Sequence, residues 1–300
     1  MLRTASIIKR KRNINFQKAI DKTNESYLYW QDRERIINLI CSYAEAYSED
    51  TYDKIIVLEH KQEQRFKLIE YISRFSDKYI TKVYQKFYNL NNKLTNYQKA
   101  LFLTLTVDPK NFHSIKQEYK ELQHAFNKLN SYLKKKYNLK QYIKVVEFTK
   151  SDIPHLHILY LHDDFIDIDK IRQLWQKYGI GIMVNIQLVQ RRYVIENDKA
   201  YLNGVLSYIL KYIVKSIGKD TNKELDPAKQ GYRSLCIKWA LQSRTFSISK
   251  AVSLILKGNK TNSNCIGQWV YCCSIPKQLL GTDLSYDAIR SIIMQFMGGG

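Results

Sequence analysis

The sequence is poor in the residues that build disulfide frameworks and structural metal sites. Its 300 residues include five cysteines and six histidines. An odd, widely spread set of cysteines without Cys-x-x-Cys spacing does not form a disulfide framework, so a reducing compartment is expected. No histidine follows His162, which argues against a zinc finger in the last third of the chain.

Long apolar segments and nucleotide-binding elements are also missing. No uncharged run approaches the length of a membrane span, and the N-terminus lacks the apolar core of a signal peptide. We therefore predict a soluble, cytoplasmic protein. No Gly-x-x-x-x-Gly-Lys-Ser/Thr element occurs, so a fused P-loop helicase is not expected.

Acidic residues are scarce relative to basic ones. The chain has 48 Lys and Arg against 28 Asp and Glu, which gives a net charge of +20. Such an excess favours a polyanionic partner, with nucleic acid first and an anionic membrane surface second, although solubilising charge is a simpler explanation. The 23 tyrosines and 11 phenylalanines also suit stacking on single-stranded bases, unless they only reflect compositional bias.

The pattern of apolar residues divides the chain into three regions. Residues 1–96 are highly charged and their apolar residues recur at helical spacing, so we predict a helical, basic accessory region. Residues 219–300 form a mixed C-terminal accessory region, partly helical from Trp239 to Leu256 and extended from Trp269 to Ile275. Residues 97–218 between them are predicted to be a domain of their own.

That middle domain alternates between strand and helix patterns. Strands are predicted over 101–107, 141–149, 153–161 and 181–189, and helices over 112–136, 167–178 and 198–217. Asp167 is expected to cap the second helix, and Gly179 to end it. The order β-α-β-β-α-β-α predicts an α+β fold with a ferredoxin-like or RRM-like antiparallel sheet, with helices on one face and the other face available for a site.

Two histidines share one face of a predicted strand. His155 and His157 lie two residues apart in an apolar run, so both imidazoles point the same way. They are a ready pair of nitrogen ligands for a divalent cation, although a purely structural pair of histidines fits the same pattern.

A carboxylate lies on the strand before the histidines. Glu147 stands within an apolar run, where an unpaired carboxylate is costly. A tight hairpin at Lys150–Asp152 would place Glu147 across from the histidine strand as a third ligand, unless it is exposed at a sheet edge. Two histidines and one carboxylate with open positions can bind Mg²⁺ or Mn²⁺ and polarise a phosphate.

The helix after the fourth strand carries two tyrosines and two lysines. Tyr208 and Tyr212 lie four residues apart on one helical face, with Lys211 and Lys215 in a row beside them. An ordinary amphipathic helix explains this spacing. Chemically, however, tyrosine is a competent nucleophile, and a nearby lysine can stabilise a phenolate or the charge that develops on phosphate.

Taken together, these motifs resemble the HUH endonuclease superfamily, and specifically its rolling-circle replication initiators, the Rep proteins. Phe102–Thr106 is similar to their first motif, Pro154–Leu159 to their histidine-hydrophobic-histidine motif, and Tyr208–Lys215 to the tyrosine motif of the two-tyrosine type. The resemblance covers roughly residues 100–218. It implies that His155 and His157 are metal ligands, that Glu147 occupies the acidic position found before the histidines in some families, and that the cofactor is Mg²⁺ or Mn²⁺.

The resemblance also implies a reaction. Tyr208 and Tyr212 would be the nucleophiles, singly or together, with Lys211 as helper. Lys215, Arg191 and Arg192 are candidate DNA contacts, although the two arginines could equally lie in a solvated loop.

The expected activity is a sequence-specific nickase and strand transferase that starts rolling-circle replication of a plasmid or virus. Its partners would be single-stranded origin DNA and the host helicase and polymerase, with no membrane, in the compartment that holds the replicon. The alternatives are a relaxase or transposase of the same superfamily, or a DNA-binding regulator without catalysis.

Overall fold

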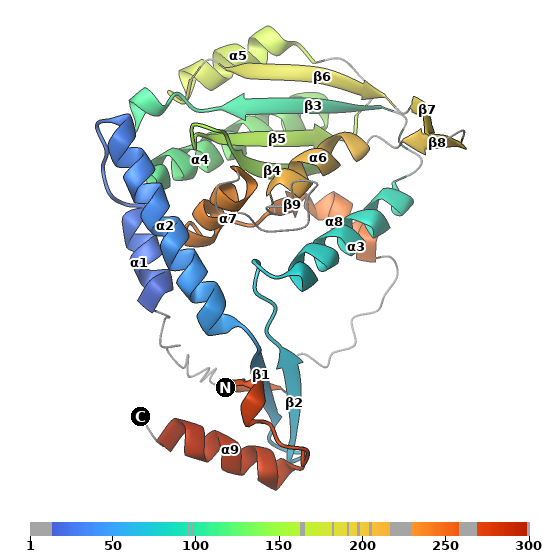
Figure 1. The fold of residues 1–300 in the computed structure, drawn as a ribbon. Coiled ribbons are helices and arrows are strands. Elements are labelled where there is room, and N and C mark those ends of the chain that lie inside the picture. Colours follow the sequence, from blue (N-terminus) through green and yellow to red (C-terminus); the bar gives the residue numbers. More distant parts are fainter. Residues whose placement is uncertain are drawn as a thin grey trace, which may run out of the picture. The chain divides into compact units, whose positions relative to one another are not determined.

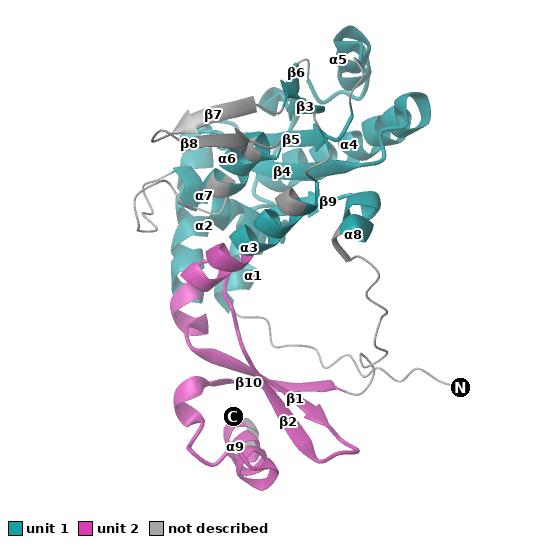
Figure 2. Ribbon diagram, turned by 90° about the vertical axis from the view of Figure 1, so that its right-hand side faces the viewer, with its two compact units in different colours: residues 1–47, 83–256 teal, residues 48–82, 257–300 magenta. Residues whose placement is uncertain are grey.

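The computed structural model describes residues 14–94, 97, 99–162, 166–181, 183–190, 192–196, 199–203, 206–216, 230–257 and 269–298. Its contacts group the chain into two compact units (Figure 2). Unit 1 comprises residues 1–47 and 83–256, and unit 2 comprises residues 48–82 and 257–300. The division predicted from the sequence, with boundaries after residues 96 and 218, stays a prediction.

The core of unit 1 is a five-stranded antiparallel sheet (Figure 1). The strands lie in the order β6 (Val184–Gln190), β3 (Lys99–Thr106), β5 (Pro154–Tyr160), β4 (Tyr142–Phe148) and β9 (Phe246–Ile248). The first four follow one another along the chain with helices at the predicted places, which confirms the α+β fold class. Their spatial order is compatible with a ferredoxin-like sheet.

Two helices cover one face of this sheet. Helix α4 (Ile115–Tyr137) buries Leu122, Phe126, Leu129 and Leu133, the stripe that its sequence spacing predicts. Helix α5 (Ile168–Lys177) is capped by the Asp167 side chain, which accepts hydrogen bonds from two backbone amides. Gly179 follows it with φ +72°, so the predicted start and end of this helix are confirmed.

The opposite face carries helix α6 (Ser207–Ser216), which packs mainly against β4 and β5. Helix α7 (Gln230–Ala240) contacts α6 and β4 and is largely buried. The backbone amide of Phe148 donates to Ser234 Oγ, and Gln230 Nε2 donates to the Phe148 carbonyl 2.8 Å away. The end of β4 is therefore fixed by side chains of α7.

The remaining helices of unit 1 lie around this sheet. They are α1 (Ile14–Lys22), α2 (Trp30–Thr51), α3 (Asp77–Lys93), α8 (Lys250–Lys257) and the 3₁₀ turn η1 (Pro109–Asn111), and parts of α2 and α3 belong to unit 2. Rings of Phe16 in α1, Tyr47 in α2 and Trp239 in α7 form one cluster, with Tyr47 and Trp239 centroids 4.9 Å apart. No helix of the described chain is long and apolar enough to span a membrane.

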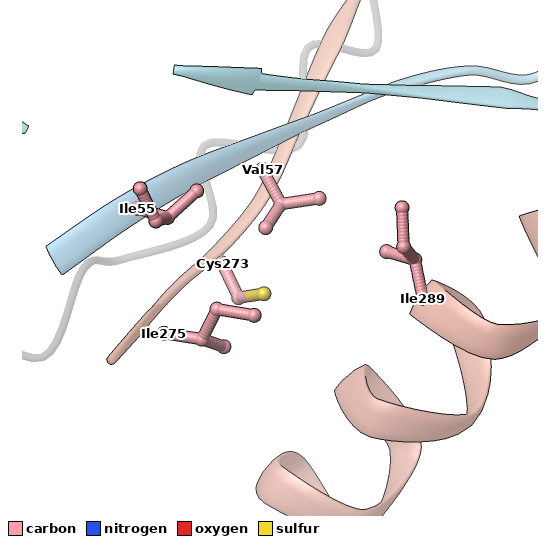
Figure 3. Close-up of a cluster of buried hydrophobic side chains, with 5 residues drawn as sticks. All are labelled: Ile55, Val57, Cys273, Ile275 and Ile289. Atoms are coloured by element: carbon pink, nitrogen blue, oxygen red, sulfur yellow. The ribbon is translucent and has the colours of Figure 1, made fainter. Parts of the chain in front are cut away.

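Unit 2 contains a three-stranded antiparallel sheet and helix α9 (Tyr286–Gly298). The strands lie in the order β10 (Val270–Pro276), β1 (Lys54–His60) and β2 (Arg65–Glu70). Helix α9 follows the 3₁₀ turn η3 (Lys277–Leu279). Figure 3 shows the small core, in which Ile289 of α9 faces apolar side chains of β1 and β10: Ile55, Val57, Cys273 and Ile275. The strand predicted over Trp269–Ile275 is confirmed.

Three stretches of the predicted helical segments form strands instead, so the prediction is wrong there. Residues 54–60 and 65–70 are strands rather than parts of a helical region, because the β-branched run at Ile55–Val57 finds a pairing partner in β10. The helix predicted over 198–217 begins only at Ser207. Residues 199–203 form strand β8, which pairs with β7 (Arg192–Glu196), and a short apolar stretch fits either structure until its partner is known.

Candidate active site

The central position of β5 in the sheet gathers the polar side chains of three strands. His155 lies opposite Thr106 of β3 and Glu147 of β4, and His157 lies opposite Thr104. Directly opposed residues of antiparallel strands project to the same face. The hairpin predicted from the sequence therefore forms, and it brings Glu147 to the histidine face as expected.

Each histidine is held by a threonine of β3. The Oγ1 atom of Thr106 lies 2.6 Å from Nδ1 of His155, and that of Thr104 lies 3.2 Å from Nδ1 of His157. When Nδ1–H of His155 donates to the Thr106 oxygen, the lone pair of this neutral imidazole is on Nε2, whereas Nε2–H of His157 donates to the Glu147 carboxylate. The threonines thus fix the ring orientation that a metal ligand needs.

Charges at this cluster balance one another. Nε2 of His157 lies 2.7 Å from Glu147 Oε2, and Lys215 Nζ lies 3.8 Å from Glu147 Oε1. Burial raises the pKa of Glu147, but the hydrogen bond to His157 and the charges of His157, Lys215 and His155 together outweigh this effect, so its pKa is lowered overall. Burial and the neighbouring His157 lower the pKa of His155 to about 4. His155 is therefore a neutral imidazole at neutral pH.

Helix α6 places its tyrosines over the histidines. Leu206, Ile209 and Ile213 are buried, and their spacing orients the helix so that Tyr208 and Tyr212 are only partly buried. The Tyr212 ring stacks on the His157 imidazole, with centroids 3.8 Å apart and planes at 29°.

Tyr208 lies beside Tyr212 in a different environment. Its hydroxyl donates to Gln187 Oε1 of β6 at 2.5 Å. Phe102 of β3 contacts both tyrosines. Its ring is edge-on to Tyr208, with centroids 4.6 Å apart, and stacked on Tyr212, with centroids 5.2 Å apart. Tyr212 therefore contacts His157 directly, whereas Tyr208 is held toward β6.

The acidity of Tyr212 is set by this packing. Burial, Tyr208 and the negative charge of Glu147 raise its pKa to about 12. Lys211 Nζ lies 4.2 Å from the Tyr208 ring centroid and 4.8 Å from that of Tyr212. The phenol is thus protonated at neutral pH, with a lysine cation close to both rings.

One pair of predicted DNA contacts cannot be placed. Arg191 lies outside the described residues. The backbone of Arg192 belongs to strand β7, and its side chain also lies outside the described part of the structure. Lys215 is described, more than half exposed, and directed to Glu147.

The donor set has the chemistry that a divalent cation requires. Two imidazoles and one carboxylate share a face, and one imidazole is already neutral. In the described residues, no three such side chains are gathered around a common point. The side chains thus have the donor atoms that such an ion binds, and they lie on the same face of the sheet.

A comparison with protein-family models decides the family. The model of the replication protein family (Rep_1) matches residues 73–262. This chain belongs to the replication protein family. No curated protein and no solved structure matches it. Membership of the Rep_1 family agrees with the resemblance to rolling-circle replication initiators, and DNA is the partner expected of a replication protein.

The Rep_1 match contains the whole site. Strands β3 to β6 and helix α6 lie within residues 73–262, whereas α1, α2 and most of unit 2 lie outside. The matched range thus includes the sheet and α6 together with α3, α7 and α8.

Sequence reasoning missed the roles of some residues in this site. Thr104 and Thr106 support the histidines, Phe102 packs under the tyrosines, and Gln187 binds Tyr208. The alternation Phe102-x-Thr104-x-Thr106 carried a usable signal, because it places all three side chains on one strand face. Gln187 had no such signal.

Proposed function

We propose that this replication protein is a metal-dependent nickase and strand transferase. It cleaves single-stranded origin DNA through a 5′-phosphotyrosine intermediate and so initiates rolling-circle replication of a plasmid or virus. The stacking of Tyr212 on His157, 3.8 Å between centroids, carries this proposal, because it unites a nucleophile with a candidate phosphate-polarising group.

Tyr212 is the proposed nucleophile. Its phenolic oxygen attacks the phosphorus atom after the phenol proton passes to water. A tyrosyl O–P bond forms, the bond between phosphorus and the 3′ oxygen breaks, and the leaving oxygen takes a proton from water. The free 3′ hydroxyl primes synthesis, and its later attack on the phosphotyrosine rejoins a strand.

The histidine cluster would hold the metal. Mg²⁺ or Mn²⁺ bound by His155, His157 and Glu147 would polarise the scissile phosphate. Thr104 and Thr106 orient the imidazoles for this role through their Nδ1 atoms. The charge of Glu147 is one of the causes that raise the pKa of Tyr212, so neutralising that charge favours the phenolate.

The lysines of α6 would stabilise the negative charges of the tyrosine phenolate and the DNA backbone. Lys211 lies within 5 Å of both tyrosine ring centroids and can stabilise the phenolate as it forms. Lys215 is exposed and is a candidate contact for the DNA backbone, as are Arg191 and Arg192. Tyr208 would serve either as a second nucleophile or as support for Tyr212.

The decisive experiment traps the intermediate. The full chain is incubated with Mn²⁺ and a randomised pool of single-stranded oligonucleotides, and the DNA-linked peptide is mapped by mass spectrometry. We expect the adduct on Tyr212, its loss in Tyr212→Phe, and its retention in Tyr208→Phe. Absence of any adduct, or an adduct that survives both substitutions together, would refute the proposal.

Family membership, DNA binding by histidine variants and the adduct assay together separate the alternatives. Family membership favours replication over mobilisation or transposition, which the same chemistry would also serve. A regulator without catalysis would bind DNA even after His155→Ala and His157→Ala, and would never form an adduct. We further propose that a host helicase and polymerase act on the nicked origin, in the compartment that holds the replicon.

A further inference from the structure

A cavity in unit 1 is lined in part by Ile153, two residues before His155 of the candidate active site. It has a volume of about 620 Å³, which is within the usual size range of ligand sites. Residues from three separate segments line it: Tyr27, Leu28, Tyr29, Trp30, Arg33, Pro109, Lys110, Phe112, His113, Ser151 and Ile153. The first of these segments precedes the part of the chain that the family model matches.

The cavity lies at the end of the sheet where the histidine strand begins. Ile153 is two residues before His155, and its carbonyl accepts a hydrogen bond from the Thr149 amide, which continues the β4–β5 ladder. Ile153 therefore lies directly before the first residue of the histidine strand. Pro109 and Lys110 belong to the turn η1, which begins three residues after Thr106 at the end of β3. Figure 1 shows the start of α2 beside this end of the sheet.

The walls of the cavity are aromatic and basic. Four Phe, Tyr or Trp residues line it together with three basic residues, and no acidic residue is among the lining residues that the structure describes. The charge of Arg33 is paired with Glu118, but Lys110 and His113 are exposed. This combination suits a planar ring attached to a negatively charged backbone.

One wall is preformed and the other is open. The Tyr27 hydroxyl donates to Glu118 at 2.9 Å, and the Tyr27 backbone amide donates to the His113 carbonyl. The Arg33 guanidinium lies 4.8 Å from the centroid of the Tyr27 ring. By contrast, the side chains that follow are largely exposed: Leu28 83%, Tyr29 68% and Trp30 50%. Adjacent exposed apolar side chains of this size mark a binding surface.

We propose that this cavity binds an unpaired base of the single-stranded DNA, next to the phosphate that Tyr212 attacks. The inference rests on the proposed function. The base would stack on Tyr29 or Trp30, and Lys110 would contact the adjoining phosphate. The basic lining without acidic residues favours DNA over an apolar protein segment. Its place two residues from His155 sets the base close to the cleaved bond.

Binding to fluorescein-labelled oligo(dT), without metal, tests the cavity. We expect Tyr29→Ala or Trp30→Ala, depending on which ring stacks on the base, to weaken binding about tenfold, as the loss of one base stack does. An abasic oligomer of the same length should bind the wild type and these variants alike, since it has no base to stack. Tyr88→Ala is the matched control, because Tyr88 is 66% exposed on α3 outside the cavity.

A second measurement uses the unmodified protein. Oligonucleotides with a photoreactive iodouracil at successive positions are crosslinked to the wild type, and crosslinked residues are mapped by mass spectrometry. Crosslinks to Tyr29 or Trp30 from a base near the phosphotyrosyl linkage support the proposal. Crosslinks only elsewhere, unchanged affinity of both variants, or an equal loss with the abasic oligomer would overturn it.

The outcomes also separate this inference from the proposed function. Adduct formation at Tyr212 with normal oligo(dT) binding by both variants would support the nickase and exclude DNA from the cavity. Base-dependent binding through Trp30 without any adduct would retain the DNA site and exclude the nickase.

Discussion

The Tyr212 ring lies on the His157 imidazole, with centroids 3.8 Å apart. His157 in turn contacts Glu147, and Tyr212 contacts Phe102. A helical residue and a strand residue thus meet at the centre of one sheet face. The contact contributes both to packing and to the proposed chemistry, and substitutions of Tyr212 can separate the two.

Tyr212→Phe should remove the chemistry and keep the packing. The phenyl ring can still stack on His157, so we expect the free energy of unfolding to change by less than about 1 kcal/mol. Tyr212→Ala should lose both the adduct and the stack, at a cost of about 3 kcal/mol because a partly buried ring is deleted. Urea denaturation and the adduct assay, run on both variants, measure the two effects. Equal destabilisation by Phe and Ala would show that the hydroxyl, rather than the ring, stabilises α6.

Thr106→Val should weaken the proposed metal site without touching a ligand. The substitution preserves the shape of the side chain but removes the Oγ1 atom that lies 2.6 Å from Nδ1 of His155. Loss of such a partner commonly reduces metal affinity about 10- to 100-fold. Calorimetric titration with Mn²⁺ measures this affinity. Thr81→Val is the control, since exposed Thr81 bonds only the Asp77 carbonyl of its own helix; equal Mn²⁺ affinity in both variants would exclude a positioning role for Thr106.

Much of the site could be predicted from the sequence because it depends on local periods. The two-residue period of β5 places His155 and His157 on one face, and a short hairpin brings Glu147 opposite. The four-residue spacing in α6 places Tyr208 and Tyr212 together. Each of these relations needs only the secondary structure and one tight turn.

The rest depends on partners that are distant in the sequence. The local apolar spacing around β1 fitted a helix. Its pairing with β10, which lies more than 200 residues later in the chain, cannot be seen in that spacing. The bonds from Thr104 and Thr106 to the histidines require the register between β3 and β5, which the strand pattern alone does not fix. The aromatic cavity combines segments around Tyr27, Pro109 and Ile153, and none of them is informative by itself.

Arg33→Met should destabilise unit 1 strongly. Arg33 donates two hydrogen bonds to Glu118, at 2.8 and 2.9 Å, and a third to the carbonyl of Asp152 at 2.7 Å. Asp152 lies in the turn between Glu147 and His155, with φ +53°. Breaking a buried pair leaves an uncompensated charge and costs about 3–5 kcal/mol. Urea denaturation measures the loss. The double variant Arg33→Met, Glu118→Met should be more stable than Arg33→Met, and the opposite order would contradict this reading of the pair.

Lys144, which lies on the face of the sheet that α4 covers, should make the free energy of unfolding depend on pH. Its Nζ donates to Gln123 Oε1 at 2.6 Å and lies 4.4 Å from the Phe126 ring centroid, under α4. Burial lowers the pKa of Lys144 from 10.5 to about 8. The folded state therefore releases this proton at lower pH than the unfolded state, so the contribution of Lys144 to stability rises between pH 8 and 10.5, by up to about 1.4 kcal/mol per pH unit.

Lys144→Met removes this pH-dependent contribution to the free energy of unfolding and tests its sign. The variant should gain stability relative to the wild type at pH 7, where the buried ammonium is still charged, and the gain should shrink as the pH rises above 8 and the wild-type lysine becomes neutral. Urea denaturation at pH 7 and at pH 9 gives the two differences, and other titrating groups cancel between the proteins. Lys140→Met is the control, because Lys140 is exposed just before the same strand. A gain that grows with pH would mean that the lysine is stabilised as a cation by its surroundings, contrary to the direction that its burial under α4 requires.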